Sequence, residues 1–459
     1  MNSVLLWAVA SELCRSPATS LDLCSQDSPN WVHYVGKFSP IAQVAPEVTM
    51  SHGPFRFVHA SDFHLEQPLA GVAEVPDHLR DRFIDAPYQA AARVFDAVLA
   101  EEAEFLILSG DLLHAQNTGP RGPLFLAEQF ARLSARKIPV YWAGGSVDPP
   151  EDWPAWLDLP ANVHVFPRGR VTELLHEHDA APAVRLIGAS RDRTRAMDPA
   201  EFTVDPSGLF TIGVAHGPAQ VAALQARGLH YWALGGRHDR ATLFSAPQVA
   251  HDCGSPQGRC PREAGAHGST LVQVDEQSRA RTSPLPADVL RWLGARLVID
   301  PGTSRDDLEG LLRERMHGLA ESAAGVDLLI SWTISGTGPL MNLLGRGALA
   351  GELLGWLRSE YGIASPARWS VALDAEPVAT LPPEWYEQEA IRGDFLREVR
   401  QYQMNPDEPL ALEEYLDPRH LAGTLSASVA IRDPQHRERV LREAALLGVD
   451  LLSGEEPQS

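Results

Sequence analysis

Five polar turns, each placed directly after a short apolar run, constrain the fold of this chain more than any other feature. The turns carry carboxylates, imidazoles and glycines and lie at residues 61–64, 110–114, 144–148, 216–217 and 235–238. The apolar runs alternate with segments of helical spacing, a pattern typical of parallel strands joined by helices in a layered α/β domain. Because open α/β sheets place their sites beyond the carboxyl ends of the strands, we expect the turns to meet at one sheet edge.

The spacing of apolar residues also predicts the individual elements. Strands are predicted at 55–59, 105–108, 140–143, 163–166, 184–187, 210–214, 231–234 and 269–274, and helices at 88–102, 124–135 and 219–226. A smaller α+β unit is predicted to follow, with strands at 295–299, 328–335 and 370–373 and helices at 305–323 and 349–360. The expected organisation is a disordered extension at 1–51, an α/β domain at 52–285, an α+β domain at 286–403, and a linker with a C-terminal helix at 404–459.

The C-terminal helix, expected at 436–447, places apolar residues at helical spacing: Val440, Leu441, Ala444 and Leu447. Such a face indicates packing on another part of the same chain. Binding of a partner helix is the alternative interpretation, and the sequence leaves both open.

Charge and composition limit the classes of function. The chain carries 39 basic and 60 acidic residues, a formal net charge of −21. Non-specific nucleic-acid binding relies on cationic side chains that neutralise phosphates, so this balance argues against a protein that coats DNA by itself. Metal ions or a partner can still bring positive charge to one site. The four cysteines form no CxxC pair and no apolar run reaches about 18 residues, so we expect a cytoplasmic protein without a membrane segment.

The side chains of the turns are of the kinds that hold transition metals. The candidate ligands are Asp62, His64, Asp111, His216 and His238. Carboxylates mixed with imidazoles suit Mn²⁺, Fe²⁺ or Zn²⁺. Each turn by itself also has a structural interpretation, as a helix cap, a tight turn or a hydrogen-bonded core histidine. Their order along the chain, each after an apolar strand, favours one shared metal site.

These motifs resemble those of the calcineurin-like metallophosphoesterases, and within them the SbcD/Mre-type DNA repair exonucleases of the YhaO-like branch. The similar segments are FVHASDFHL, ILSGDLL, IGVAHG and YWALGGRHDR, the later CGSPQGRCPREAGAHGSTLVQVD, and GTGPL and EAIRGDFLREV from the α+β unit. The resemblance spans roughly residues 54–400. It implies a four-layered sandwich, in which two mixed sheets are flanked by helices, followed by a small α+β DNA-capping domain. It also implies metal-dependent hydrolysis of phosphodiesters.

The resemblance further implies which residues hold metals. A first ion would take Asp62, His64, the bridging Asp111 and His238, whereas a second would share Asp111 and add His216. We therefore expect one tightly bound ion, Mn²⁺ by preference, and a second only at high metal concentration.

Three positions depart from the family pattern. Ser146 stands where an asparagine ligand is usual, Val147 where the catalytic histidine is usual, and Gly236 where a further histidine ligand is usual. Valine cannot donate a proton to a leaving oxygen, and general-acid help is typically worth roughly 10²–10⁴ in rate. No residue is therefore assigned as catalytic, and whether the chain is an enzyme stays open.

Three functions remain compatible with these departures. The first is a metal-binding relative with reduced or lost catalysis that acts on or recognises DNA ends. The second is an active exonuclease in which His114, Asp148 or Asp239 serves as a substitute ligand. The third is a phosphatase on small phosphoesters. The family resemblance implies DNA ends and an SMC-like ATPase subunit of the SbcC type as partners, and it leaves a homodimer open.

The N-terminal extension gives the first testable prediction. Residues 1–49 precede the first convincing strand and show no periodic apolar face, and an upstream start codon would explain their presence. A chain that starts at Met50 should therefore unfold with unchanged cooperativity and midpoint. Thermal denaturation of the two lengths checks this expectation, and a large loss of stability in the shorter chain would contradict it.

Overall fold

The computed structural model describes residues 53–114, 119–178, 181–204, 208–323, 325–377, 381, 383–406, 408, 410 and 434–452. The extension at 1–51 lies outside these residues, so its expected disorder and the effect of its removal stay predictions. Within the described residues, no helix is both long and apolar enough to cross a membrane.

The first sheet has six strands and contains the earliest polar turns. Its order is β12 (Ala280–Pro286), β11 (Gly268–Val274), β1 (Phe55–Ala60), β2 (Phe105–Leu108), β3 (Val140–Ala143) and β4 (Val163–Phe166). Strands β1 to β4 are parallel, whereas β11 and β12 run antiparallel at one edge. The turns after β1, β2 and β3 therefore leave the sheet at the same edge.

The second sheet also has six strands and contributes the later turns. Its order is β5 (Thr172–His178), β6 (Ala181–Gly188), β7 (Phe210–His216), β8 (Tyr231–Gly235), β10 (Val249–Asp252) and β9 (Ala241–Phe244). Strands β6, β7, β8 and β10 are parallel, and β5 and β9 are antiparallel edge strands. Both sheets are thus mixed.

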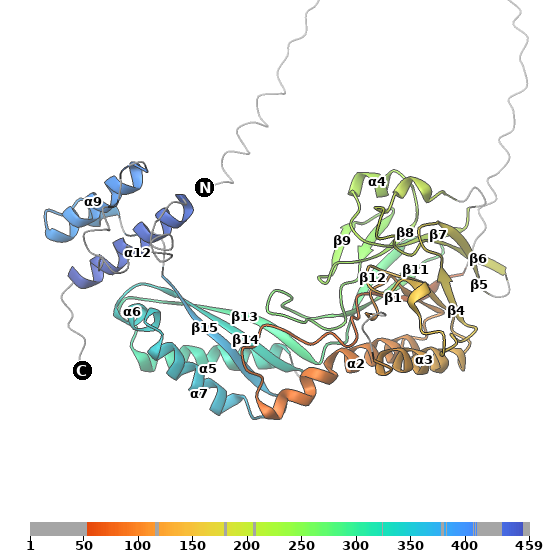
Figure 1. The fold of residues 1–459 in the computed structure, drawn as a ribbon, viewed down its shortest axis with the longest axis horizontal. Helices are drawn as coiled ribbons and strands as arrows, with labels where there is room; N and C mark the ends of the chain where they lie inside the picture. The colour runs from red at the N-terminus through yellow and green to blue at the C-terminus, as the bar shows by residue number, and fades with distance from the viewer. Residues whose placement is uncertain are drawn as a thin grey trace, which may run out of the picture. The chain divides into compact units, whose positions relative to one another are not determined.

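The two sheets pack face to face with helices on their outer sides (Figure 1). Phe57 and Phe105 from the first sheet meet Phe210 and Tyr231 from the second in a fully buried layer. Helices α2 (Asp77–Ala100) and α3 (Arg121–Ser134) cover the outer face of the first sheet, and α4 (Val221–Gln225) packs against the second. Short 3-10 turns lie at Pro150–Asp152 and Pro199–Glu201. The expected four-layered sandwich is confirmed.

A third, smaller sheet follows in the sequence. Strands β13 (Leu290–Ile299), β14 (Asp327–Gly336) and β15 (Arg368–Pro377) are parallel. Helices α5 (Arg305–Ser322), α6 (Pro339–Gly345) and α7 (Ala348–Tyr361) bury their apolar faces on this sheet around the fully buried Trp332. These elements form the α+β unit that the sequence predicts, with the helix α6 in addition.

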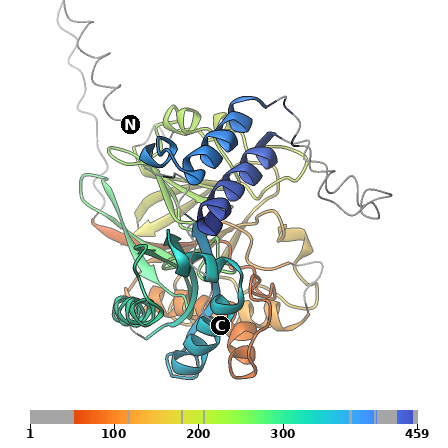
Figure 2. The ribbon, with the colours of Figure 1, turned by 90° about the vertical axis from the view of Figure 1, so that its left-hand side faces the viewer.

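The last described elements are α8 (Pro383–Tyr386), α9 (Ile391–Met404) and α12 (Pro434–Leu452). Helices α9 and α12 lie side by side (Figure 2), and Leu396 of α9 packs with Leu441 and Ala445 of α12. Packing of the C-terminal helix within the chain is thus confirmed. The predicted face is wrong in part, because Ala444 and Leu447 are exposed.

Helix α2 starts eleven residues before its predicted beginning, at Asp77 rather than Tyr88. Pro87, directly before the predicted beginning, lies inside the helix and is buried. The additional turns are stabilised by tertiary contacts, since Leu79 and Phe83 pack with Trp292 of β13. The side chain of Arg82 also pairs with Asp327 at the start of β14.

A buried histidine in the second sheet generates a prediction about stability. The imidazole of His251 is fully buried and hydrogen-bonds with the hydroxyls of Thr242 and Thr270, each at 2.9 Å. Burial lowers the pKa of His251 to about 4, with a further contribution from Arg240. The unfolded chain, with a histidine pKa of about 6.5, takes up this proton first as the pH falls. The free energy of unfolding should therefore decrease between pH 6.5 and pH 4.

The variant His251→Gln should show a shallower decrease over this range, by up to about 1.4 kcal/mol per pH unit. Urea unfolding at pH 7.5, 6.5 and 5.5 measures the slope. His317→Gln, which changes an exposed histidine of α5, is the matched control and should keep the wild-type slope. Equal slopes in wild type and His251→Gln would contradict the prediction.

Candidate metal centre

The turns that follow β1 and β2 are joined to each other beyond the ends of their strands. The backbone amides of Asp62 and His64 donate to the carbonyls of Gly110 and Asp111, both at 2.9 Å, and the amide of Leu65 donates to the carbonyl of Leu112. The backbone of Asp62, His64 and Asp111 is left-handed, with φ of 54°, 45° and 55°. Non-glycine residues in this region are uncommon and cluster at functional sites. The pairing therefore fixes the turns in conformations that a free loop would avoid.

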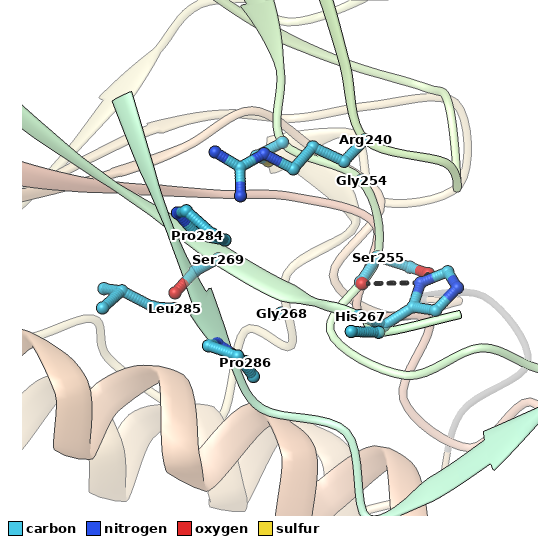
Figure 3. A pocket seen from close by; sticks show the side chains of 11 residues that line it. Arg240, Gly254, Ser255, His267, Gly268, Ser269, Pro284, Leu285 and Pro286 are labelled. Atoms are coloured by element: carbon cyan, nitrogen blue, oxygen red, sulfur yellow. Dashed lines mark hydrogen bonds between the residues drawn. The ribbon is translucent and has the colours of Figure 1, made fainter. Parts of the chain in front are cut away.

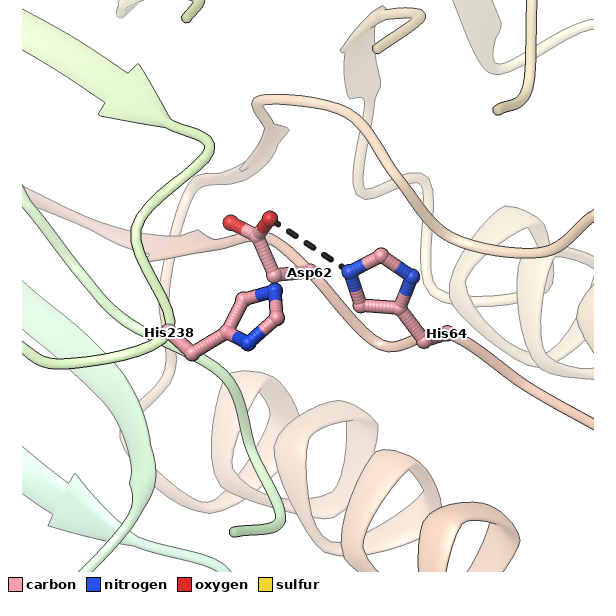
Figure 4. Close-up of side chains that lie close together, drawn as sticks. All are labelled: Asp62, His64 and His238. Atoms are coloured by element: carbon pink, nitrogen blue, oxygen red, sulfur yellow. Dashed lines mark ion pairs between the residues drawn. The ribbon is translucent and has the colours of Figure 1, made fainter. Parts of the chain in front are cut away.

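The five predicted ligands come together in two overlapping groups. In one, ligand atoms of Asp62, His64 and His238 all lie within 4.8 Å of one another (Figure 4). In the other, the same holds for Asp62, Asp111 and His216. The ends of β1, β2, β7 and β8 and the turns that follow them thus bring these residues to one place, as the sequence predicts.

In each of the two carboxylates, of Asp62 and Asp111, one oxygen binds a backbone amide and the other faces the imidazoles of the cluster. Asp62 Oδ2 accepts from the amide of Gly236 at 2.9 Å, and Asp111 Oδ1 accepts from the amide of Val147 at 3.0 Å. The other oxygens face His64, whose Nε2 lies 3.7 Å from Asp62 Oδ1 and 3.8 Å from Asp111 Oδ2. One oxygen of each carboxylate is therefore fixed, and the second is presented to the imidazoles.

Several buried polar atoms of this cluster have no hydrogen-bond partner among the described residues: Asp62 Oδ1, His64 Nδ1 and His64 Nε2. Buried polar groups without partners are costly, and a divalent cation between these atoms would satisfy them. Burial lowers the pKa of His64, which favours the neutral imidazole that binds metals. The residues present therefore fit a divalent metal ion.

Asp111 and His216 form the tightest pair of the cluster, with His216 Nε2 3.3 Å from Asp111 Oδ2. Burial disfavours the charged form of both residues, but the attraction between them is stronger. The pKa of His216 therefore rises to about 9, and the pKa of Asp111 falls below its usual range. Metal ligands must be deprotonated, so an ion that bound His216 would have to displace this proton.

The orientation of His238 depends on a residue that the sequence did not single out. Glu263 Oε1 lies 2.7 Å from His238 Nδ1, and Glu263 Oε2 accepts from the backbone amide of Arg259 at 2.8 Å. Although burial disfavours its charge, these hydrogen bonds and the nearby cations lower the pKa of Glu263 to about 2. A carboxylate on one ring nitrogen fixes the ring and directs the other nitrogen towards the cluster.

The loop that carries Glu263 is fixed by its own polar contacts. The Ser255 hydroxyl and His267 Nδ1 hydrogen-bond at 3.1 Å across a small cavity beside β11 and β12 (Figure 3). Within this loop Arg259 reaches the cluster, because its Nη2 lies 3.1 Å and 3.2 Å from the two ring nitrogens of His238. The only signal in the sequence was the resemblance of this segment to the end of the phosphoesterase domain, which assigned no role to either residue.

The three proposed substitute ligands lie outside both groups. Asp148 is buried, and its two oxygens accept from the backbone amides of Asp111, Leu112 and Gly145 at 2.6–2.9 Å. It therefore anchors the turn that carries Asp111. His114 lies beside His64, with ring centroids 5.9 Å apart, and contacts Gln67. Asp239 is exposed.

The three residues that depart from the family pattern stabilise the site through hydrogen bonds of their backbone groups. Gly236 and Val147 donate amide hydrogens to Asp62 and Asp111, and the carbonyl of Ser146 accepts from Arg193 Nε at 2.7 Å. Gly236 has a φ of 104°, and a Cβ there would lie 3.2 Å from His216 Nε2. A histidine at this position would be strained. The local backbone conformation therefore favours glycine and explains why the ligand is missing.

The contact between Glu263 and His238 predicts a loss of metal affinity on substitution. Glu263→Gln removes the charge that orients the imidazole, and loss of such a partner typically weakens metal binding by about 10- to 100-fold. Titration with Mn²⁺, followed by electron paramagnetic resonance of the free ion, measures the change. Glu276→Gln, at an exposed turn, should retain wild-type affinity. Unchanged affinity in Glu263→Gln would show that Glu263 does not position His238.

Comparisons with known proteins agree with this chemistry. The family model described as Calcineurin-like phosphoesterase matches residues 55–228. The uncharacterized metallophosphoesterase YhaO of Bacillus subtilis (strain 168) is 26% identical over 335 residues, which cover 70% of this chain and 81% of the relative. Two solved structures, a dimetal phosphatase from Danio rerio and Vacuolar Protein Sorting 29 from Cryptosporidium parvum, are each 12% identical over 50% of this chain. The matches cover 98% and 97% of those chains, with TM-scores of 0.32 and 0.23. The matched residues 55–228 contain Asp62, His64, Asp111 and His216, so this part of the metal centre is similar to that of the calcineurin-like phosphoesterases.

Proposed function

We propose that this chain is a metal-dependent phosphodiesterase of reduced rate that acts on DNA ends. The observation that carries the proposal is the convergence of Asp62 Oδ1, Asp111 Oδ2 and the imidazole of His64, with His238 beside them. Next to this set, His216 is the only further ligand side chain in the described groups. The second group adds one imidazole, that of His216, to carboxylates that it shares with the first position, which favours a single tightly held ion.

Asp62, His64, Asp111 and His238 would hold this ion, and its mixed oxygen and nitrogen ligands suit Mn²⁺. When bound, such an ion supplies Lewis-acid polarisation of a phosphoryl oxygen and activation of a water molecule. The protein residues supply the fixed geometry, because backbone amides hold the distal oxygens of both carboxylates and Glu263 orients His238.

Val147 is the reason that we expect a reduced rate. Its amide hydrogen-bonds to Asp111 Oδ1, so the residue lies beside the cluster, but its side chain cannot give a proton to the leaving oxygen. A positioned acid typically contributes roughly 10²–10⁴ in rate. Without a general acid, the rate of hydrolysis depends on the metal ion and on how readily the leaving group departs unprotonated.

DNA ends as the substrate, and an SMC-like ATPase as a partner, belong to this proposal. They are supported by the resemblance of segments in the α+β unit to a DNA-capping domain. The net charge of −21 supports a role at one metal site rather than along the DNA backbone. We place the protein in the cytoplasm, without a membrane partner, and a homodimer remains open.

The test is the hydrolysis of bis(p-nitrophenyl) phosphate and of an end-labelled DNA duplex in the presence of Mn²⁺. We expect slow cleavage of both, with abolition by chelator and by Asp111→Asn. Asp275→Asn, which changes an aspartate of the turn after β11, is the control and should retain the wild-type rate. Cleavage restricted to the monoester p-nitrophenyl phosphate would instead indicate a small-molecule phosphatase. Loss of all hydrolysis with metal still bound would indicate a protein that only recognises DNA ends.

The missing acid generates a further prediction. Val147→His should raise the rate of diester cleavage by up to about 10²–10⁴-fold, because it restores a proton donor next to the cluster. Steady-state kinetics at pH 7 measure the change, and Val147→Leu controls for the size of the side chain. A rate in Val147→His equal to that of Val147→Leu would contradict the role that we assign to this position.

A further inference from the structure

One arginine side chain lies directly against the incomplete half of the metal centre. A Cβ added at Gly217 would lie 2.3 Å from Nη1 of Arg191, so the guanidinium packs on the backbone of Gly217. Gly217 follows His216, and Arg191 and His216 line the same surface hollow. The backbone amide of Arg191 donates to the carbonyl of Gly144 at 2.8 Å, which anchors the residue to the turn after β3.

Arg191 lies near the position of the ligand that this chain lacks, because both Arg191 and Gly236 adjoin Gly217. A Cβ at Gly236 would lie 3.2 Å from the amide nitrogen of Gly217 and 3.2 Å from His216 Nε2. Gly236, Gly217 and His216 are therefore contiguous, and Arg191 covers the same stretch of backbone. A histidine ligand is usual at position 236 in the resembling family, whereas here the guanidinium of Arg191 packs on the adjoining Gly217.

The neighbouring charged residues are engaged with one another. Arg195 pairs with Glu201, Arg168 pairs with Asp192, and Arg193 donates to the carbonyl of Ser146. Across the described residues, no hydrogen bond or ion pair engages the guanidinium of Arg191. A partly buried arginine without an anionic partner, next to a metal centre, is available to bind an anionic ligand.

Arg259, which contacts His238, is in a different situation. Its Nη1 is engaged by Gln67 and its Nη2 by His238. Two of its three guanidinium nitrogens therefore contact protein groups, although its buried Nε has no partner among the described residues, whereas no hydrogen bond or ion pair among them engages the guanidinium of Arg191.

We propose that Arg191 binds a phosphoryl oxygen of the substrate on the His216 side of the centre and supplies the positive charge that a second metal would otherwise provide. This inference rests on the proposed function. A guanidinium is permanently charged, binds phosphate oxygens in a bidentate geometry, and needs no ligand set of its own. Preorganised positive charge at this point stabilises the negative charge that develops on the phosphoryl oxygens during hydrolysis.

The experiment measures the binding of inorganic phosphate to protein loaded with stoichiometric Mn²⁺, by isothermal titration calorimetry. Arg191→Met keeps an aliphatic side chain over Gly217 and removes the charge. We expect it to weaken phosphate binding by about 10- to 100-fold, since hydrogen bonds to charged groups contribute that much. Arg195→Met removes a charge from the same segment and should leave phosphate affinity unchanged. Both variants should hold the same amount of Mn²⁺ as the wild type by elemental analysis.

Equal phosphate affinity in wild type and Arg191→Met would overturn the proposal, and so would an equal loss in the two methionine variants. Absence of phosphate binding by the metal-loaded wild type would overturn it as well. If Arg191→Met fails to fold, Arg191→Lys replaces it in the experiment. Its loss of phosphate affinity should be smaller than that expected for Arg191→Met, because lysine keeps the charge but lacks the bidentate donors of the guanidinium. Failure of the wild type to take up Mn²⁺ contradicts the proposed function itself. An unchanged phosphate affinity with Mn²⁺ bound contradicts only the role of Arg191.

Discussion

The parallel pairing of β1 with β2 is the constraint on which the rest of the site depends. The register places Phe57 opposite Phe105 and Ala60 opposite Leu108, and the stacked rings of Phe57 and Phe105 lie 4.8 Å apart. Because side chains alternate between the faces of a sheet, a slip of one residue would turn these rings out of the sandwich core. The same register continues into the turns, where the amide of Asp62 meets the carbonyl of Gly110. Burial of the core thereby holds the left-handed backbone of the ligand residues.

The chemistry of the site follows from how the carboxylates share their oxygens. Gly236 and Val147 bind one oxygen of Asp62 and of Asp111 through backbone amides, so the other oxygen of each is directed at the imidazoles. Two residues that remove a ligand and an acid from the family pattern thus still build the first metal position. The single ion that we propose would be held by these residues, with the guanidinium of Arg191 beside His216 and Gly217, an arrangement that suits the slow phosphodiesterase that we propose.

Much of this fold could be predicted because its central strands are continuous apolar runs that end at glycine or a polar residue. The buried strands β2 and β3 have this pattern, and β1 approaches it with Arg56 and His59 among its apolar residues. The edge strand β5 was missed because all but one of its residues are exposed or only partly buried, so no apolar run marks it. The first turns of α2 were missed because their apolar face packs on a strand more than 200 residues later in the sequence, at Trp292. Glu263 and Arg191 could not be assigned roles, since only the tertiary structure brings them to His238 and Gly217.

The most direct test of a single-ion centre is the anomalous diffraction of crystals equilibrated with Mn²⁺, recorded at the manganese absorption edge. The account predicts one strong peak, bounded by Asp62, His64, Asp111 and His238, with any second peak near His216 much weaker. Two peaks of equal height on either side of Asp111, or a peak away from these residues, would contradict it.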